Sequence, residues 1–190
     1  MTEQELIKLF IERSALLEGH FRLTSGLHSN RYIQCAQVLQ YPDLSAMLGE
    51  KLAAPFSEQG VNLVVGPAIG GIIVAQETGR ALGVRAIFTE REQGKMTLRR
   101  GFGIKRGERV VVVEDVVTTG GSTKEVIEMV KEYGGVVAGV GSLVDRHSGA
   151  LDFGVPFYPL LKLDIETYSS DDCPLCREGI PVVKPGSRKE

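Results

Sequence analysis

Apolar and polar residues alternate in blocks along this chain, and the blocks predict strands and helices in turn. Short apolar runs rich in valine occur at residues 61–65, 84–88, 109–113 and 136–144. Segments in which apolar residues recur every three or four positions lie between them, at 70–82 and 122–133. A short β-branched run predicts a buried strand, and the other spacing predicts an amphipathic helix. Such alternation predicts an α/β fold with a central, mostly parallel sheet flanked by helices.

The first 60 residues have a different pattern. Thr2 and Glu5 have the spacing of a capping box at a helix start. Helical spacing then continues through Leu6, Leu9, Phe10, Arg13, Leu16 and Leu17. Residues 19–39 alternate loosely between turn signals, which is typical of short strands or a β-hairpin. Pro42 predicts the start of a second helix that runs to about residue 59. We expect residues 1–40 to form an N-terminal helix and a small hood over an α/β core at 41–165.

Residues 166–190 are rich in proline, glycine and charge, so we expect a surface wrap or a partly disordered tail of the same single domain. This tail contains a Cys-x-x-Cys pair, Cys173 and Cys176. A zinc ribbon needs four ligands, and the chain has no second cysteine pair, although two tails in a dimer would supply four thiolates. A redox pair normally follows a strand at a helix start. We therefore expect this pair to be structural, or reduced and without a role.

The composition of the chain limits which partners and which cellular location we expect for the protein. The 190 residues carry a formal net charge of −2, which argues against bulk affinity for nucleic acid or an anionic membrane. The N-terminus lacks the basic and apolar regions of a signal peptide, and no apolar run has membrane-spanning length. Three cysteines, an odd number, fit a reducing compartment. We expect a globular protein of the cytoplasm.

Residues 110–122 carry the most chemistry. Four valines lead to Glu114 and Asp115, and the next residues are Val116, Val117, Thr118, Thr119, Gly120, Gly121 and Ser122. A glycine-rich turn at a helix N-terminus offers free N–H groups to a phosphate, and the hydroxyl side chains add donors. The acid pair repels phosphate but suits the hydroxyls of a ribose, or a Mg²⁺ held through water. Together these features predict a phosphorylated sugar as ligand.

A second glycine turn is expected beside the first, because the carboxyl ends of parallel strands meet at one edge of a sheet. Residues 66–71 (Gly-Pro-Ala-Ile-Gly-Gly) lie between a predicted strand and a helix. By itself, this turn is equally consistent with a strand-to-helix connection that binds nothing and with an anion-binding site. Next to a phosphate loop, it favours a diphosphate ligand.

Cationic side chains follow two other strands. Residues 89–101 hold four cations and are either a mobile loop that closes over pyrophosphate or a solvated hairpin. Arg91 and Lys95 are the stronger candidates for ligand contact, ahead of Arg99 and Arg100. Arg146 follows the strand at 136–144, and its planar guanidinium can form two parallel hydrogen bonds to a carboxylate. The alternative for Arg146 is a surface pair with the neighbouring Asp145.

The order of these segments resembles the orotate phosphoribosyltransferases of the type I phosphoribosyltransferase family. The resemblance covers about residues 1–165 and rests on Ser25-Gly26-x-x-Ser29-x-x-Tyr32, Gly66-Pro67-Ala68, the basic loop, the acid pair with Thr-Thr-Gly-Gly-Ser, and Asp145-Arg146. It implies the type I phosphoribosyltransferase fold. It also implies transfer of the 5-phosphoribosyl group from 5-phosphoribosyl-1-pyrophosphate (PRPP) to orotate, giving orotidine 5′-monophosphate and pyrophosphate in pyrimidine biosynthesis.

The same resemblance implies roles for individual residues. PRPP would contact residues 114–122 together with Arg91 and Lys95, and the catalytic residues would be Lys95, Asp115 and Glu114. Orotate would contact Thr118, Arg146 and Tyr32. Mg²⁺ would be the cofactor, bound mainly through PRPP and without direct side-chain ligation. The chain would form a homodimer whose basic loop, 89–101, reaches the neighbouring subunit's site.

The chain also departs from the family pattern. Thr24 stands where many relatives carry lysine, Ile69-Gly70 replaces Tyr-Lys, and the basic loop lacks the usual Lys-x-x-Lys-x-His run. Two alternative functions therefore stay open: a phosphoribosyltransferase for another base, such as a purine, and a non-catalytic PRPP-responsive regulator. Such regulators usually carry a DNA-binding appendage or a basic face.

Overall fold

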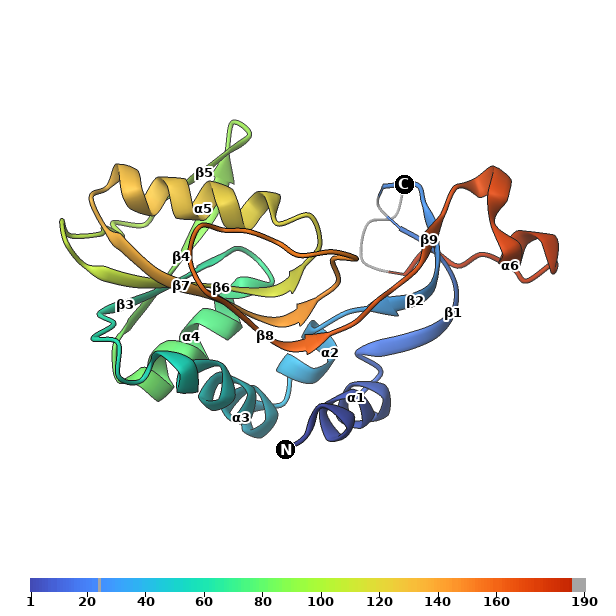
Figure 1. Cartoon of the computed structure of the whole chain (residues 1–190), viewed down its shortest axis with the longest axis horizontal. Coiled ribbons are helices and arrows are strands. Elements are labelled where there is room, and N and C mark those ends of the chain that lie inside the picture. Colours follow the sequence, from blue (N-terminus) through green and yellow to red (C-terminus); the bar gives the residue numbers. More distant parts are fainter. Residues whose placement is uncertain (24, 186–190) are drawn as a thin grey trace.

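The computed structural model describes residues 1–23 and 25–185; Thr24 and residues 186–190 lie outside the described part. Figure 1 shows two sheets side by side. A six-stranded sheet with helices on both faces forms the larger part, and a three-stranded sheet lies beside it together with the C-terminal segment. The smaller sheet is called the hood sheet below.

The larger sheet contains the βα units expected from the sequence. Its strands are β3 (Leu63–Pro67), β4 (Arg85–Glu92), β5 (Lys95–Thr97), β6 (Arg109–Val117), β7 (Val136–Asp145) and β8 (Phe157–Lys162), in the order β5-β4-β3-β6-β7-β8. All neighbours are parallel except β4 and β5, which form an antiparallel hairpin. The predicted, mostly parallel sheet is confirmed. Of the two alternatives for the basic loop at 89–101, the structure shows the hairpin, formed by β4 and β5.

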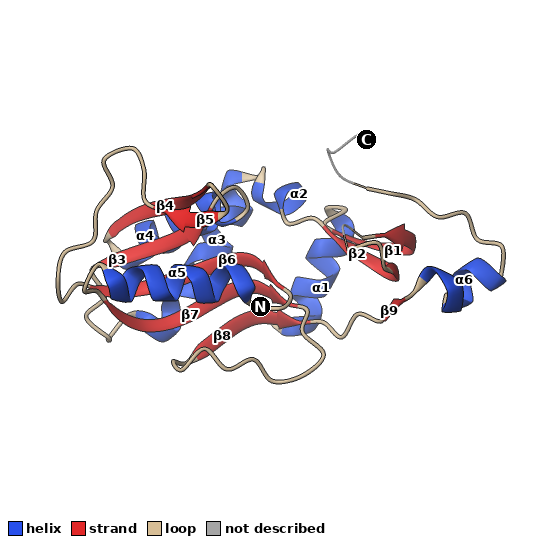
Figure 2. Ribbon diagram, turned by 90° about the horizontal axis from the view of Figure 1, so that it is seen from above, coloured by secondary structure: helices blue, strands red, loops and turns tan. Residues whose placement is uncertain are grey.

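Helices cover both faces of this sheet. They are α1 (Glu3–Glu12), α2 (Ala36–Leu39), α3 (Pro42–Ala53) with a 3₁₀ turn at Ala54–Phe56, α4 (Gly71–Leu82) and α5 (Gly121–Glu132). Figures 1 and 2 show α5 on one face and α3 and α4 on the other. The capping box predicted for the first helix is confirmed: the Glu5 N–H donates to Thr2 Oγ1 (3.3 Å), and the Thr2 N–H donates to Glu5 Oε2 (2.7 Å).

Strand β6 joins two hydrophobic cores. The four valines at 110–113 are fully buried and alternate between the faces of the sheet, as the two-residue period of a strand requires. Val111 and Val113 pack into the cluster under α3 and α4, whereas Val110 and Val112 pack into the cluster under α5. The run of β-branched residues therefore places β6 at the centre of the fold.

The helical spacing predicted through Leu17 is wrong beyond residue 12. Helix α1 ends at Glu12, and Ser14 adopts a left-handed φ of 55° that turns the chain. Leu16 then begins β1 (Leu16–Arg22), where it is buried against the same core that Leu6 and Phe10 enter from the helix. A buried Leu16 is consistent with either a helix or a strand. The apolar pattern alone therefore could not distinguish the two elements at this position.

The hood sheet combines both ends of the chain. Strand β1 pairs with β2 (His28–Ile33), which confirms the predicted hairpin, and β2 pairs with β9 (Thr167–Tyr168). A 3₁₀ turn (Ser170–Asp172) and a one-turn helix, α6 (Pro174–Arg177), follow, and a bridge joins Phe21 to Val183. Of the two alternatives for the tail, residues 166–185 are therefore a surface wrap. The sequence did not indicate β8, β9 or α6.

Helices α3 and α4 pack closely where Gly49 meets Glu77. A Cβ on Gly49 would lie 2.6 Å from the backbone carbonyl carbon of Glu77. We expect Gly49→Ala to lower the free energy of unfolding by about 1–3 kcal/mol in urea denaturation, despite the higher helix propensity of alanine. Gly103→Ala is the control, because no atom lies within 4 Å of a Cβ there. Equal stability of the two variants would contradict the close packing.

Candidate active site

The carboxyl ends of β3, β6 and β7 lie at one edge of the sheet. The parallel register pairs Val65 with Val112 and Val117 with Asp145. The loops that follow these strands, 66–71, 118–122 and 145–149, therefore share this edge, as the sequence predicted. We call this group of loops the strand-end site.

The acid pair lies inside strand β6 and not after it, because pairing with β7 continues to Val117. Glu114 is only 9% exposed. The Asp115 N–H donates to Glu114 Oε1 (3.2 Å), and the Val116 N–H donates to Asp115 Oδ1 (2.8 Å). The strand backbone thus fixes both carboxyl groups at the strand-end site.

Burial changes the protonation of this pair. Loss of solvent, and then the charge of the adjacent Asp115, raise the pKa of Glu114 from 4.5 to about 9. Without a bound cation, Glu114 therefore holds its proton at neutral pH. A ligand that brings positive charge would favour its ionised form.

Gly70 brings the second glycine turn onto the acid pair. A Cβ at this position would overlap the Asp115 carboxylate. A side chain at this position would have to displace the Asp115 carboxylate, which gives a physical reason for the departure from the lysine expected by resemblance. Loop 66–71 is therefore in contact, through Gly70, with the acid pair of β6.

The loop before α5 has the conformation of an anion site. Gly120 caps the helix with a left-handed φ of 75°, and a Cβ there would lie 3.0 Å from the Phe153 ring. The Lys124 N–H makes the helix's first hydrogen bond, to Gly120 O (2.9 Å), so the Ser122 and Thr123 N–H groups precede the helical ladder. A cavity of about 60 Å³ lies here, lined by residues 114 and 116–123. Its backbone donors suit a phosphate.

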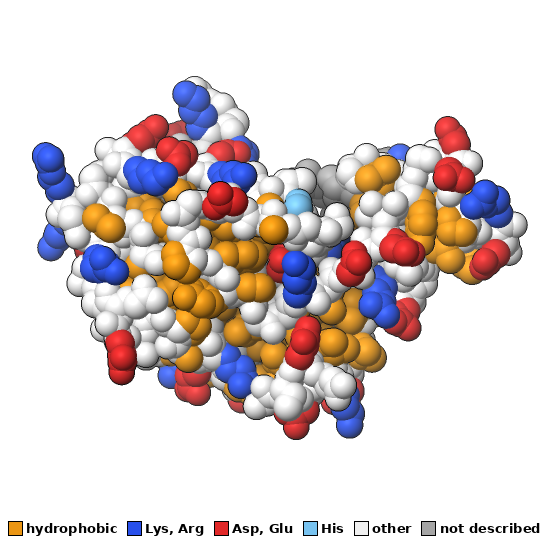
Figure 3. All heavy atoms as spheres, in the orientation of Figure 1, with side chains coloured by type: hydrophobic (Ala, Val, Ile, Leu, Met, Phe, Trp, Pro, Cys, Tyr) orange, Lys and Arg blue, Asp and Glu red, His pale blue; other side chains and the backbone are white. Residues whose placement is uncertain are grey.

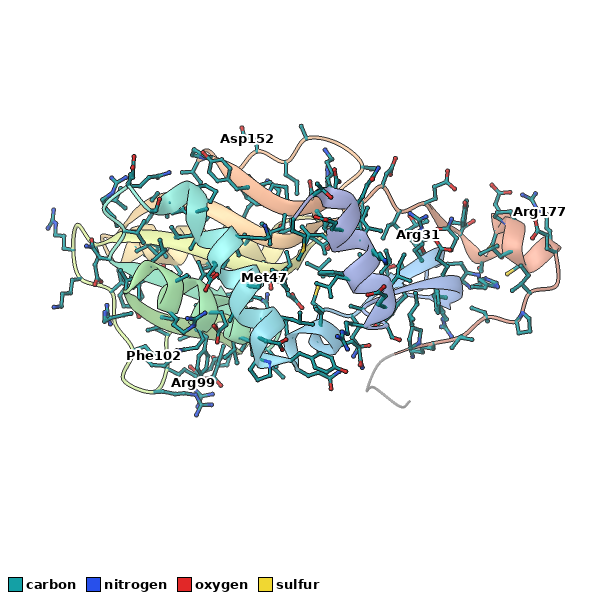
Figure 4. The ribbon with its side chains drawn as sticks, turned by 90° about the horizontal axis from the view of Figure 1, so that it is seen from below. Arg31, Met47, Arg99, Phe102, Asp152 and Arg177 are labelled. Atoms are coloured by element: carbon teal, nitrogen blue, oxygen red, sulfur yellow. The ribbon has the colours of Figure 1, made fainter. Side chains whose placement is uncertain are left out.

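The arginines of the basic loop bind acidic neighbours in this structure. Arg91 makes a two-pronged contact with Glu125 of α5 (3.0 and 3.1 Å). Arg100 pairs with Glu90 (2.8 Å), and Arg99 lies 3.8 Å from Glu92. Figure 4 shows Arg99 and Phe102 on the loop that follows β5.

Lys95 is placed differently from these arginines. It lines a groove of about 430 Å³ between β5 and α5, together with Gly121, Glu125 and Glu128. Its ammonium group makes no ion pair within the part of the chain that the structure describes. Of the predicted basic contacts, Lys95 is thus the one that lies near the start of α5 without a fixed partner among these residues.

Arg146 lies next to the phosphate loop. Its N–H donates to Val117 O (2.8 Å), and its partly buried guanidinium forms no hydrogen bond or ion pair with any described residue. Burial lowers the pKa of Arg146, and the nearby Tyr32 acts in the opposite direction. Arg146 forms no surface pair with Asp145, whose Oδ1 accepts the His147 N–H (2.9 Å). A partly desolvated guanidinium of this kind suits an anionic ligand group.

A cluster of histidine and cysteine side chains lies away from the strand-end site, and the sequence did not predict it. Cys173 and Cys176 contact His20 and His28 of the hood sheet. From the sequence we considered a second cysteine pair, or the tail of a second subunit, as the source of further ligands, and did not consider these two histidines. Folding brings two histidines from the other end of the sequence to the cysteine pair, and no local spacing signals that contact.

Two surface observations bear on partners. Figure 3 shows positive and negative side chains interspersed on the face in view, with no block of one sign there. Among the residues described, no helix is both long and apolar enough to cross a membrane.

Comparisons with known proteins agree with this site. A family model for the phosphoribosyl transferase domain matches residues 37–167. The orotate phosphoribosyltransferase of Pelotomaculum thermopropionicum is 60% identical over 189 residues and covers 100% of both chains. That of Carboxydothermus hydrogenoformans is 61% identical over 187 residues, with 97% of this chain and 98% of the relative covered. A crystal structure of orotate phosphoribosyltransferase from Aeropyrum pernix superposes with a TM-score of 0.68 at 29% identity, covering 83% of this chain and 93% of the other. This chain therefore belongs to the phosphoribosyl transferase family and, within it, to the orotate phosphoribosyltransferases.

Proposed function

We propose that this chain transfers the 5-phosphoribosyl group from PRPP to orotate, giving orotidine 5′-monophosphate and pyrophosphate for pyrimidine biosynthesis. The observation that carries the proposal is Arg146 beside the phosphate loop, whose partly buried guanidinium has no hydrogen-bond or ion-pair partner among the described residues. A guanidinium at this position suits the carboxylate that distinguishes orotate from uracil and the purines. Thr118, next to Val117, and Tyr32 would complete the contacts to orotate.

We expect PRPP to occupy the rest of the strand-end site in the following orientation. Residues 118–122 would hold the 5-phosphate through backbone N–H groups and hydroxyls. Glu114 and Asp115 would accept hydrogen bonds from the ribose hydroxyls. The pyrophosphate would then lie toward loop 66–71, which touches Asp115 at Gly70. Lys95 and Arg91 would bind it from the β4–β5 hairpin of the neighbouring subunit in the expected homodimer, when that hairpin closes and its Arg91 leaves Glu125 of the same subunit.

The reaction needs no covalent nucleophile from the protein. A ring nitrogen of orotate forms a bond to the anomeric carbon as the bond from that carbon to pyrophosphate breaks. The proton on that nitrogen is released to the departing pyrophosphate or to water. Positive charge develops on the ribose, as in glycoside cleavage. Asp115, together with Glu114 once it is ionised, stabilises that charge, while Lys95 stabilises the leaving group. Closure of the basic loop excludes water, which would otherwise hydrolyse PRPP.

A divalent ion such as Mg²⁺ is the cofactor we expect. The Asp115 carboxylate and the ribose and pyrophosphate oxygens of PRPP are the hard oxygen donors that Mg²⁺ prefers. PRPP would hold the ion for the most part, with Asp115 reaching it through water. When bound, the ion neutralises charge on the leaving pyrophosphate.

The expected assembly is a cytoplasmic homodimer. The β4–β5 hairpin projects from the core in Figure 1, which supports its reaching a neighbouring subunit's site. A regulator that binds nucleic acid is less well supported, since the net charge is −2 and Figure 3 shows mixed charges.

The proposal is tested with purified protein, PRPP and Mg²⁺, and with orotate, uracil, adenine or hypoxanthine as the base. We expect loss of orotate absorbance that depends on both PRPP and Mg²⁺, with little turnover of the other bases. Turnover of a purine in place of orotate would contradict the role of Arg146. Binding of PRPP without any turnover would favour the regulator.

Asp115→Asn tests the acid pair. We expect kcat to fall about 10²–10³-fold, because a carboxylate that faces developing positive charge becomes neutral. The free energy of unfolding should change by less than about 1 kcal/mol, since asparagine keeps the shape of the side chain. Asp43→Asn, at an exposed position of α3, is the control and should keep kcat. An unchanged kcat in Asp115→Asn would remove the acid pair from the mechanism.

Arg146→Lys tests recognition of the base. Loss of a charge-assisted, two-pronged contact should raise the KM for orotate about 10–100-fold and leave the KM for PRPP nearly unchanged. The preference for orotate over uracil should fall by a similar factor. The exposed Arg106→Lys serves as control. Equal rises in both KM values would instead indicate a general distortion of the site.

Glu114→Gln tests whether burial raises the pKa of Glu114 in the ligand-free protein. The unfolded carboxyl loses its proton near pH 4.5 and the folded one near pH 9, so the stability present below pH 4.5 is lost progressively up to pH 9. Glutamine removes this loss. We expect the ligand-free variant to melt at least about 2 °C higher than the parent at pH 8, with little difference near pH 4. A lower melting temperature at pH 8 would contradict the raised pKa of Glu114.

A further inference from the structure

Four metal-ligating side chains meet where the C-terminal segment crosses the hood sheet. They are His20 of β1, His28 of β2, and Cys173 and Cys176 around α6, on the right in Figure 1. One donor atom from each, namely His20 Nε2, His28 Nδ1 and the two Sγ atoms, lies within 4.8 Å of the other three. We propose that this cluster binds one Zn²⁺ ion as a structural site.

Four of the six distances between donor atoms are close to those of tetrahedral coordination. Zn–N bonds of about 2.0–2.1 Å and Zn–S bonds of about 2.3 Å place neighbouring ligand atoms about 3.3–3.8 Å apart. His20 Nε2 lies 3.5 Å from Cys173 Sγ and 3.8 Å from Cys176 Sγ, and His28 Nδ1 lies 3.3 Å from Cys176 Sγ. The two nitrogens are 2.9 Å apart and would separate by a few tenths of an ångström around the ion.

A hydrogen bond outside the cluster prepares His20 for this role. His20 Nδ1 lies 2.7 Å from the carbonyl oxygen of Ile180, which can only accept, so Nδ1 carries the proton. Nε2 of the neutral ring then presents its lone pair to the other three side chains. A backbone carbonyl on the second ring nitrogen is the usual support of a metal-bound histidine.

Burial and charge favour a closed zinc site. His20, His28 and Cys173 are 3%, 6% and 1% exposed, while Cys176 lies at the surface. On binding, each thiol loses its proton, and the two thiolates cancel the charge of Zn²⁺ at a mostly buried position. Two sulfur and two nitrogen donors in a tetrahedron select zinc over Mg²⁺ or Ca²⁺. The protein fills all four positions, which is typical of a structural site and not of a catalytic one.

The site would fix the C-terminal segment to the hood. Strand β9 contributes only two residue pairs to the hood sheet, and the bridge between Phe21 and Val183 adds one more connection. Figure 4 shows Arg177 of α6 at the tip of this segment, far from the core. All four ligands lie outside residues 37–167, which match the family model. The ion would therefore stabilise an addition to the shared core, and through β2 it would also support Tyr32.

Metal analysis of the full-length chain, purified under reducing conditions and free of any affinity tag, tests the proposal. We expect about one zinc ion per chain. Replacement of zinc by Co²⁺ should give the intense visible bands of tetrahedral cobalt and a thiolate charge-transfer band. Removal of the metal by a chelator should lower the melting temperature by about 5 °C or more, and added Zn²⁺ should restore it.

Variants separate a metal site from a merely structural cluster. Cys173→Ser should lose the metal, whereas Cys176→His should keep it with a weaker charge-transfer band, because one thiolate is replaced by another nitrogen ligand. Cys35→Ser and His147→Asn change the remaining cysteine and histidine and should keep the zinc content of the parent. Absence of transition metal and of any cobalt spectrum would overturn the proposal. So would undiminished zinc in Cys173→Ser, or a metal-free disulfide between Cys173 and Cys176.

Discussion

Strand β6 is paired in parallel with β3 on one side and β7 on the other, and the site depends on this pairing. Its valines enter the cores on both faces of the sheet, so the strand can neither slide nor rotate without exposing one of them. Pairing with β7 continues through Glu114 and Asp115 to Val117. The pairing therefore fixes the strand, and the Asp115 and Val116 N–H groups of that strand in turn donate hydrogen bonds to the two carboxyl groups.

The pairing of β6 explains how the fold keeps Glu114 and Asp115 in a buried position despite the cost in stability. Burial holds the proton on Glu114 in the free protein, which costs stability above the ordinary pKa of a carboxyl. The strand backbone and the close approach of Gly70 keep the groups in place all the same. A site that carries this cost before binding is prepared for the positive charge that develops on the ribose.

The sequence was most informative where chemistry and local pattern coincide. The two βα turns were predicted at the right places, because glycine, the hydroxyl residues and the flanking strand and helix signals are all local, although the structure shortens them to 68–70 and 118–120. The prediction ended β6 too early, since carboxylates are uncommon in buried strands and their burial depends on the pairing with β7. The contact of Arg91 with Glu125 joins β4 to α5 and has no local signal either.

The histidine–cysteine cluster marks the limit of sequence reasoning most clearly. Cys173 and Cys176 were recognised as a pair, but His20 lies 153 residues before Cys173. Only the crossing of the tail over the hood sheet brings them together. Position in the fold, more than spacing in the chain, determines which side chains can share a ligand.

The most direct measurement is a crystal structure with orotidine 5′-monophosphate bound. The account predicts the phosphate on the backbone N–H groups of residues 118–122, the ribose hydroxyls on Glu114 and Asp115, and the base carboxylate on the Arg146 guanidinium. A nucleotide bound with its carboxylate away from Arg146, or with its phosphate elsewhere than in the 118–122 loop, would contradict it.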